Sequence, residues 1–166
     1  SLFKLSGELQ PRLGSGLPYT VPRGMYQCVD GKWVGVSASS DTVAARVMKI
    51  LGLETDERFT TFDGRMEHRE LLQELMGKWC ATRARDEVVA IFEAAEAAVG
   101  PVFDMSDIAT DPHYAARNMI QIVGDTPMQG LIAALSKTPG VLRDEGHALD
   151  ADRDDITTRG WKSNTI

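Results

Sequence analysis

Short runs of alternating apolar and polar residues predict a β-hairpin near the start of the chain. The stretch YQCVDGKWVGV (residues 26–36) carries β-branched and aromatic residues on both sides of Asp30-Gly31. An Asp-Gly pair supplies two positive-φ positions for a tight turn. The pattern therefore predicts strands at residues 25–28 and 33–37. Nothing in this hairpin is chemically reactive.

Three later segments carry apolar residues at three- and four-residue spacing, which is the pattern of amphipathic helices. We predict helices over residues 41–51, 65–81 and 85–98. The inward-facing residues are Val43, Val47, Met48 and Leu51 in the first, Leu71, Leu72, Leu75, Met76 and Trp79 in the second, and Val88, Ile91, Phe92 and Ala95 in the third.

The residues at the helix ends agree with the first helix but not with the third. Ser39 or Ser40 can cap the first helix, and Gly52 follows its end. Ala84 stands where a Ser or Thr would pair with Glu87 in a capping box. Either Thr82 caps the third helix instead, or the start of that helix is weaker by about 1 kcal/mol.

The second half of the chain predicts shorter elements. A buried strand is expected at residues 100–103, and helical turns are expected to begin at Asp104 or Ser106 and at Asp111-Pro112. Apolar runs predict strands at residues 119–123 and 131–135, separated by a turn at GDTPMQG (residues 124–130). The last twenty-odd residues are acidic and show no periodicity.

The order of these elements indicates an α+β fold, with a small antiparallel-rich sheet and helices packed on one face. Residues 1–9 read as the end of a helix that stops near Gly7, and the Gly/Pro-rich stretch up to residue 24 reads as a connector. We therefore predict a connector region at 1–24, a small α+β domain at 25–125, and a return segment with an acidic tail at 126–166.

Composition excludes several classes of protein. The chain has 166 residues and a formal net charge of −6, which argues against binding to nucleic acid or to an anionic membrane surface. Two distant cysteines, Cys28 and Cys80, indicate a reducing compartment, so a cytoplasmic location is expected. No apolar run or leader signal predicts membrane insertion or secretion. The missing initiating Met suggests a fragment or a processed chain.

No metal site is expected. The three histidines are His68, His113 and His147, and none is spaced for zinc with another ligand. We expect His68 to face solvent and His113 to be a surface or capping residue. Asp150, Asp152 and Asp154 imitate the start of a calcium loop, but Asp155 replaces the required Gly and Trp161 the required Glu.

Candidate nucleophiles are also missing. No serine lies in a G-x-S-x-G motif, and neither cysteine has a nearby histidine, so both are expected to be free and buried. The stretch RLGSGLP (residues 12–18) matches neither a P-loop nor a dinucleotide fingerprint. The residues alone therefore indicate an α+β domain without an internal catalytic set.

Four stretches in order carry a family resemblance: SGELQPRLGSGLP, VPRGMYQCVDGKWVGVSA, LGLETDERFTTFDGRMEHRELLQELMGKWCATRARDEV and VGPVFDMSDIATDPHYAARNM. Together they resemble the C-terminal part of the class III CoA-transferases (CaiB/BaiF-like), which include formyl-CoA transferase, the carnitine CoA-transferases and α-methylacyl-CoA racemase. The family's closing L-G-x-H-T segment is not recognisable here. The resemblance implies that this chain is mainly the small domain of a protein more than twice as long.

The same resemblance implies where the chemistry lies. The family's catalytic Asp, and the His and Asp of the racemase, belong to the large domain and match no position here. In the transferases a glycine-rich loop of the small domain covers the site, and RLGSGLPY occupies that region in this chain. We therefore expect Gly14 and Gly16 to allow close approach to a thioester, Arg12 to meet a phosphate or carboxylate, and Tyr19 to wall the acyl pocket.

Three functions remain open at this point. The first is transfer of CoA between an acyl-CoA and a carboxylic acid, with this segment binding the acyl-CoA and closing the site but inactive alone. The second is C2 epimerisation of an acyl-CoA by the same fold. The third is a non-catalytic interaction module. For the enzyme, the implied partners are the missing large domain and a second chain in an interlocked homodimer, with coenzyme A as substrate.

Overall fold

The computed structural model describes residues 2–9 and 11–160. Trp161, the twelfth position of the rejected calcium loop, lies outside the described residues. Contacts divide the chain into two compact units, Ser1–Phe103 and Asp104–Ile166. The domain limits expected from the sequence at residues 24 and 125 remain a prediction. The α+β fold class is confirmed.

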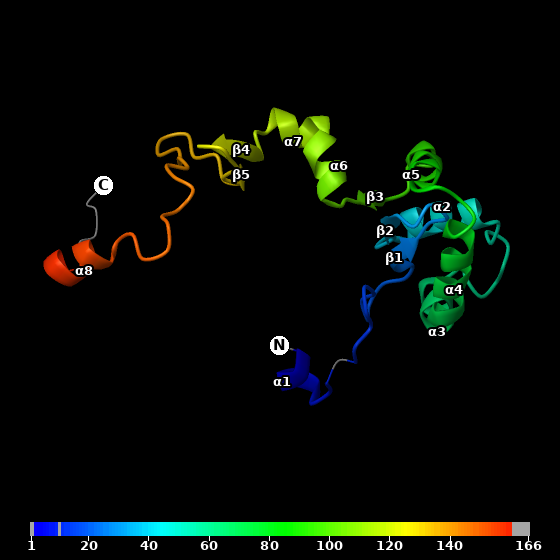
Figure 1. The fold of residues 1–166 in the computed structure, drawn as a ribbon. Helices are drawn as coiled ribbons and strands as arrows, with labels where there is room; N and C mark the ends of the chain where they lie inside the picture. Colours follow the sequence, from blue (N-terminus) through cyan, green and yellow to red (C-terminus); the bar gives the residue numbers. More distant parts are fainter. Residues whose placement is uncertain (1, 10, 161–166) are drawn as a thin grey trace. The chain divides into compact units, whose positions relative to one another are not determined.

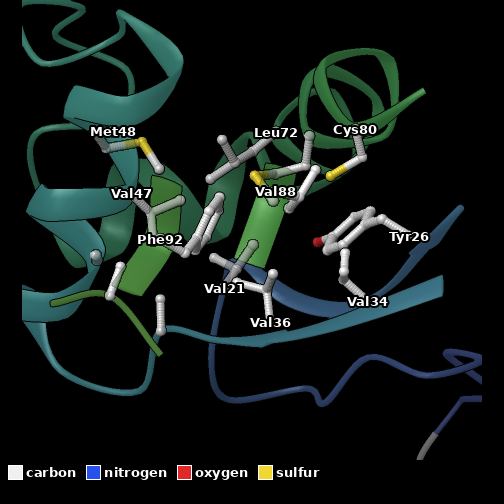
Figure 2. Packing of buried hydrophobic residues seen from close by; sticks show 14 of the residues in the cluster. Val21, Tyr26, Val34, Val36, Val47, Met48, Leu72, Cys80, Val88 and Phe92 are labelled. Carbon is white, nitrogen blue, oxygen red and sulfur yellow. The ribbon is translucent and has the colours of Figure 1, made fainter. Parts of the chain in front are cut away.

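Unit one contains a three-stranded antiparallel sheet in the order β1-β2-β3, with helices on one face (Figures 1 and 2). Its elements are α1 (Leu2–Ser6), β1 (Arg23–Gln27), β2 (Trp33–Ser37), α2 (Asp41–Leu51), α3 (Phe62–Glu67), α4 (Arg69–Cys80), α5 (Arg85–Ala94) and β3 (Val99–Val102). The predicted hairpin and the predicted helix over 41–51 are confirmed, and Ser40 caps that helix through Val43 N.

The hairpin turn differs in one detail from the expected Asp-Gly turn. Only Gly31 has a positive φ, at 77°. Gly31 N donates to Cys28 O at 3.0 Å and Cys28 N donates to Lys32 O at 2.8 Å, so three residues form the loop. A three-residue hairpin loop needs a left-handed conformation only at its last position, where glycine is favoured.

The core of unit one lies between the sheet and the helices (Figure 2). Tyr26, Val34 and Val36 point from the sheet toward α2, α4 and α5. From the helices come the predicted residues Val47, Met48, Leu72, Met76, Val88 and Phe92, all of them buried. Alternation along β1 and β2 leaves the outward-facing residues on the opposite face of the sheet.

The single helix predicted over residues 65–81 is wrong, because two helices meet at His68. Thr61 begins the first of them by accepting from Gly64 N at 3.1 Å. His68 has a non-helical backbone (φ −100°, ψ 27°), and its ring packs edge-on against Phe59 with centroids 6.4 Å apart. His68 is therefore half-buried, and the expectation that it faces solvent is also wrong.

The end of α5 also falls earlier than predicted, at Ala94 instead of residue 98. Glu96 takes the left-handed conformation with φ 52°, and Ala97 N donates to Phe92 O at 2.8 Å. These two features form a Schellman motif without its usual glycine. Arg46 holds Glu96 through the backbone oxygen at 2.7 Å and the carboxylate at 2.9 Å.

The start of α5 has a cap that neither sequence alternative foresaw. The Thr82 hydroxyl donates to Trp79 O at 3.0 Å and does not cap the helix. Instead, Asp30 in the hairpin loop accepts from Arg85 N at 3.1 Å. This hydrogen bond is also the main reason that the pKa of Asp30 is lowered. The Asp30 carboxylate, which is distant in sequence, thus accepts a hydrogen bond from the first turn of α5 in place of a capping hydroxyl.

Unit two is built from short elements: α6 (Met105–Thr110), α7 (Pro112–Ala116), β4 (Ile120–Val123), β5 (Thr126–Gln129) and α8 (Arg153–Arg159). The predicted caps are confirmed, since Asp104 forms a capping box with Asp107 and Asp111 accepts from His113 N. One expectation is wrong, because the second strand lies at Thr126–Gln129 rather than at 131–135. The tail, for which no element was predicted, contains α8.

The second strand was predicted too late in the chain because the apolar run at residues 131–135 was given more weight than the turn signal at Gly124-Asp125. Gly124 has φ 60° and Val123 pairs with Thr126, so Gly124-Asp125 forms a two-residue hairpin loop. Residues 131–135 are exposed and carry no strand.

Candidate functional site

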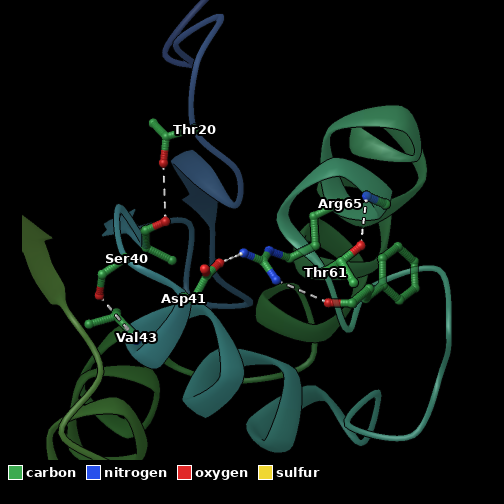
Figure 3. Close-up of polar contacts among 9 residues, drawn as sticks. Thr20, Ser40, Asp41, Val43, Thr61 and Arg65 are labelled. Atoms are coloured by element: carbon green, nitrogen blue, oxygen red, sulfur yellow. Dashed lines mark hydrogen bonds and ion pairs between the residues drawn. The ribbon is translucent and has the colours of Figure 1, made fainter.

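The candidate site is the loop at residues 11–19, which was singled out from the sequence. It contains two tight turns. Gly16 N donates to Leu13 O at 3.0 Å and closes the first, in which Gly14 has φ 60°. Leu17 and Thr20 form an isolated bridge that closes the second around Tyr19. The Thr20 hydroxyl, which is buried, donates to Ala38 O at 3.1 Å (Figure 3).

Side chains of unit one hold this loop by its polar atoms. The Ser15 hydroxyl oxygen accepts from Met25 N at 2.9 Å, at the middle of β1. From α4, the Arg69 guanidinium donates to Leu17 O, and Gln73 Nε2 donates to Arg23 O at 2.9 Å. The Tyr26 hydroxyl donates to Gln73 Oε1. The loop is therefore ordered against β1 and α4.

The four predicted site residues lie together in this short segment. Arg12, Gly14 and Tyr19 are exposed, and 68% of Tyr19 is accessible. Gly16 is half-buried, and a Cβ there would lie 3.2 Å from Leu13 O. Close packing within the turn therefore accounts for glycine at position 16. The roles of all four residues toward a ligand remain predictions.

Sequence reasoning missed Ser15 and Arg69, which hold the loop, and Gln73, which joins α4 to β1 just after it. A signal was present for the two residues of α4, since they are four apart and so share one helix face beside the apolar stripe. What that face meets could not be inferred, because Leu17 and Arg23 are about fifty residues away in sequence.

A second polar cluster ties α2 to α3 (Figure 3). Arg65 is 3% exposed and donates to Asp41 Oδ1 at 2.5 Å and to Phe59 O at 3.3 Å. Asp41 is in the first turn of α2, whose N-terminal end favours a negative charge. The buried guanidinium, held by one carboxylate and one carbonyl, joins α2 to the segment that leads into α3.

The buried groups that could be nucleophiles are inert. Cys28 and Cys80 are free and buried, as expected. Burial is the main cause that raises the pKa of the Cys80 thiol to about 12, and it also raises the pKa values of Cys28 and the Tyr26 hydroxyl. These groups stay protonated at neutral pH. Across residues 2–9 and 11–160, no cluster of His, Cys, Asp and Glu is arranged to bind a metal.

No helix among the described residues is long and apolar enough to cross a membrane. Fold and site together define a class: an α+β unit that presents an ordered glycine-containing loop, while its buried thiols and phenol are unreactive. The comparisons with known proteins specify this class further. The model of CoA-transferase family III matches residues 3–153, and the chain belongs to that family.

Two relatives from Chloroflexus aurantiacus illustrate the similarity. Succinyl-CoA–D-citramalate CoA-transferase is 30% identical over 94% of this chain and 41% of its own length. The beta subunit of succinyl-CoA–L-malate CoA-transferase is also 30% identical, over 94% of this chain and 44% of its own. A solved CaiB/BaiF family protein from Brucella suis has the same fold (TM-score 0.78, 22% identity), covering 95% of this chain and 42% of that one. The chain thus spans less than half the length of these proteins.

Proposed function

We propose that this chain is the C-terminal, small-domain portion of a CoA-transferase, and that it helps to bind an acyl-CoA and to close the active site. The observation that carries the proposal is the family match over residues 3–153, which includes the anchored loop. The names of both Chloroflexus relatives pair succinyl-CoA with a hydroxydicarboxylate. Succinyl-CoA with D-citramalate or L-malate is therefore the substrate pair to test first.

In the proposed reaction, a carboxylate outside this chain attacks the thioester carbon, CoA leaves as its thiolate, and a mixed anhydride forms. The thiolate then attacks the enzyme carbonyl of the anhydride, which releases the donor acid and leaves an enzyme thioester. The acceptor carboxylate attacks this thioester, CoA leaves again as its thiolate, and a second mixed anhydride forms. Attack of the thiolate on the acceptor carbonyl gives the acceptor-CoA and restores the enzyme carboxylate. This chain contributes by holding the thioester in place and excluding water, so that the anhydride and the enzyme thioester are not hydrolysed.

The roles proposed for the loop come from the family resemblance, and its geometry supports them. Gly14 is exposed, and a Cβ there would have no neighbour within 4 Å, so a thioester can approach its backbone. Gly16 N donates to Leu13 O and so closes the turn, and the missing Cβ lets these two residues lie close together. The exposed guanidinium of Arg12 suits a phosphate or a substrate carboxylate, and the exposed ring of Tyr19 suits the wall of an acyl pocket.

The proposed partners are an acyl-CoA, a carboxylic acid, the larger part of the protein and a second copy in an interlocked homodimer. Coenzyme A is a substrate in this proposal and not a resident cofactor. The free, buried thiols support a reducing, cytoplasmic location. Transfer is proposed ahead of epimerisation because the matched relatives are named as CoA-transferases.

The test is a complementation experiment. The complementing part is defined as the portion of the D-citramalate transferase outside its match to this chain. We expect no CoA transfer from succinyl-CoA to D-citramalate by this chain alone, and transfer when the complementing part is added, measured by chromatography of the CoA esters. Arg12→Ala and Tyr19→Ala should lower kcat/KM at least tenfold, whereas Lys49→Ala, an exposed cation of α2, should not.

Three results would contradict the proposal. Turnover by this chain alone would mean that it holds its own nucleophile. Exchange of the C2 proton without CoA transfer would indicate an epimerase. Stable binding of the complementing part without either reaction, and without a thermal shift on addition of CoA, would indicate an interaction module.

A further inference from the structure

Within the described residues of unit one, helices pack on one face of the sheet (Figure 2), and the other face has an unusual composition. Register places Met25, Gly35 and Gly100 in one row across the three strands, and Trp33 and Val102 beside them in the next row. We call these five residues the open sheet face. Met25 is 51%, Trp33 42% and Val102 39% exposed.

Nothing within the described chain explains the two glycines. Neither Gly35 nor Gly100 has a positive φ. A Cβ at Gly100 would have no neighbour within 4 Å, and one at Gly35 would meet only Gly100 O, at 3.9 Å, an ordinary contact. Because glycine weakens a strand interior, a pair of them in register marks a place where another backbone or a ligand approaches closely.

The residues around the open sheet face have the composition of the rim of a protein–protein interface. The five residues carry no ionisable side chain, and alternation puts Arg23, Gln27 and Ser37 on the same face around them. An apolar centre containing Trp and Met within a polar rim is the usual anatomy of a protein–protein contact. A sheet face this apolar is also rarely left uncovered in a soluble protein.

We propose that the open sheet face is the docking surface for the larger part of a family III CoA-transferase, with that part's backbone lying against Gly35 and Gly100. We choose this occupant because of the lengths of the relatives. The match to the D-citramalate transferase covers 94% of this chain but 41% of the transferase, and the match to the Brucella protein covers 95% of this chain but 42% of that protein. In both proteins the matching segment belongs to a chain more than twice as long. The inference rests on the proposed function and adds the surface through which that function is assembled.

The first measurement is oxidative footprinting of this chain with and without the complementing part defined above. Met25 and Trp33 are both oxidisable, so each reports directly on the open sheet face. Addition of the complementing part should lower the oxidation of both residues at least fivefold. Protection that develops with the concentration of this chain alone would assign the face to a second copy and overturn the proposal.

The second measurement compares matched glycine substitutions. Gly35→Ala and Gly100→Ala should leave the melting temperature of this chain equal or higher, yet weaken binding of the complementing part in calorimetry. Gly100→Val should weaken it at least tenfold, because the added atoms meet a close-packed partner. Gly77→Ala is the control, since Gly77 in α4 also has no neighbour within 4 Å of a Cβ. It should leave the affinity unchanged.

The outcomes separate this inference from the proposed function. If the complementing part binds and restores CoA transfer, but the Gly35 and Gly100 variants bind as tightly as the original and Trp33 stays exposed, only the docking surface is wrong. If the complementing part does not bind the original chain at all, both the proposed docking surface and the proposed function are contradicted.

Discussion

The two units of this chain are stabilised in different ways. In unit one, Phe59, Leu72 and Phe92 are fully buried in a core shared by the sheet and the helices. Among the described residues of unit two, Gly130 alone is buried. Even apolar side chains of this unit, such as Ile122, Ile132 and Leu149, are exposed. Unit two instead has strong local features: two capped helices and a tight hairpin.

The difference shows that a segment can form regular secondary structure without forming a hydrophobic core. Capping boxes, Asp-Pro helix starts and two-residue turns act over three or four residues, so unit two forms them without distant partners. A core requires apolar faces from several elements to meet, and unit one alone brings them together. Four substitutions, ranked by the size of the change that we expect, test this contrast.

Phe92→Ala should cause the largest loss of stability. The ring is fully buried and contacts Trp79 edge-on, with centroids 5.9 Å apart, so its removal leaves a cavity that costs about 3–5 kcal/mol. Urea unfolding followed by circular dichroism measures the loss. Ile122→Ala in unit two is the control, because this residue is 67% exposed and its loss should cost less than about 0.5 kcal/mol. Equal losses would mean that unit two has a core of its own.

Asp41→Asn should have the next largest effect. The substitution keeps the shape of the side chain but removes the charge that faces the buried Arg65 guanidinium. A buried cation that loses its partner is destabilising, but the Asp41 side chain is 78% exposed, so screening by solvent limits the loss to about 1 kcal/mol. Asp63→Asn in α3, at an exposed position, is the matched control. No change in the urea midpoint for Asp41→Asn would show that the ion pair contributes nothing.

Asp30→Asn tests whether a distant carboxylate caps α5. The folded-state pKa of Asp30 is lowered, chiefly by the hydrogen bond from Arg85 N. Its contribution is therefore fully present above the ordinary carboxyl pKa of about 3.9 and is lost as the pH falls through the lower folded value. At pH 7 the variant should melt at a lower temperature than the original, and the two should converge in strong acid. A difference that persists unchanged in acid would exclude this cap.

Asp111→Ala should have the smallest and most local effect. Its carboxylate accepts from His113 N at 2.8 Å and from Tyr114 N at 3.1 Å. Loss of the cap should speed hydrogen exchange of these two amides severalfold and leave the amides of the unit one sheet unchanged. Slower or unchanged exchange at His113 would contradict the local origin of this helix.

Features encoded over a few residues were predicted well. The hairpin, α2 and its Ser40 cap, and the Asp104 and Asp111 helix starts all depend on neighbours in sequence. Two errors arose where a residue outside the local segment intervened, whereas the misplaced strand of unit two came from the local turn at Gly124-Asp125. Phe59 packs against His68 at the break between α3 and α4, and Arg46 holds Glu96 at the end of α5. At the candidate site, the loop was found from its glycines, but its anchor Arg69 was not.

The order of most elements and the inward-facing stripes of the helices could be predicted from residue type and local spacing, which act through backbone sterics and periodic burial. The family was indicated separately, by the resemblance of four stretches of the chain. The cap that Asp30 provides for α5, the burial of Arg65 against Asp41 and the contact of α4 with the loop at residues 11–19 became visible in the folded chain alone. Each of these contacts joins residues far apart in the chain, and their pairing depends on how the apolar faces pack together.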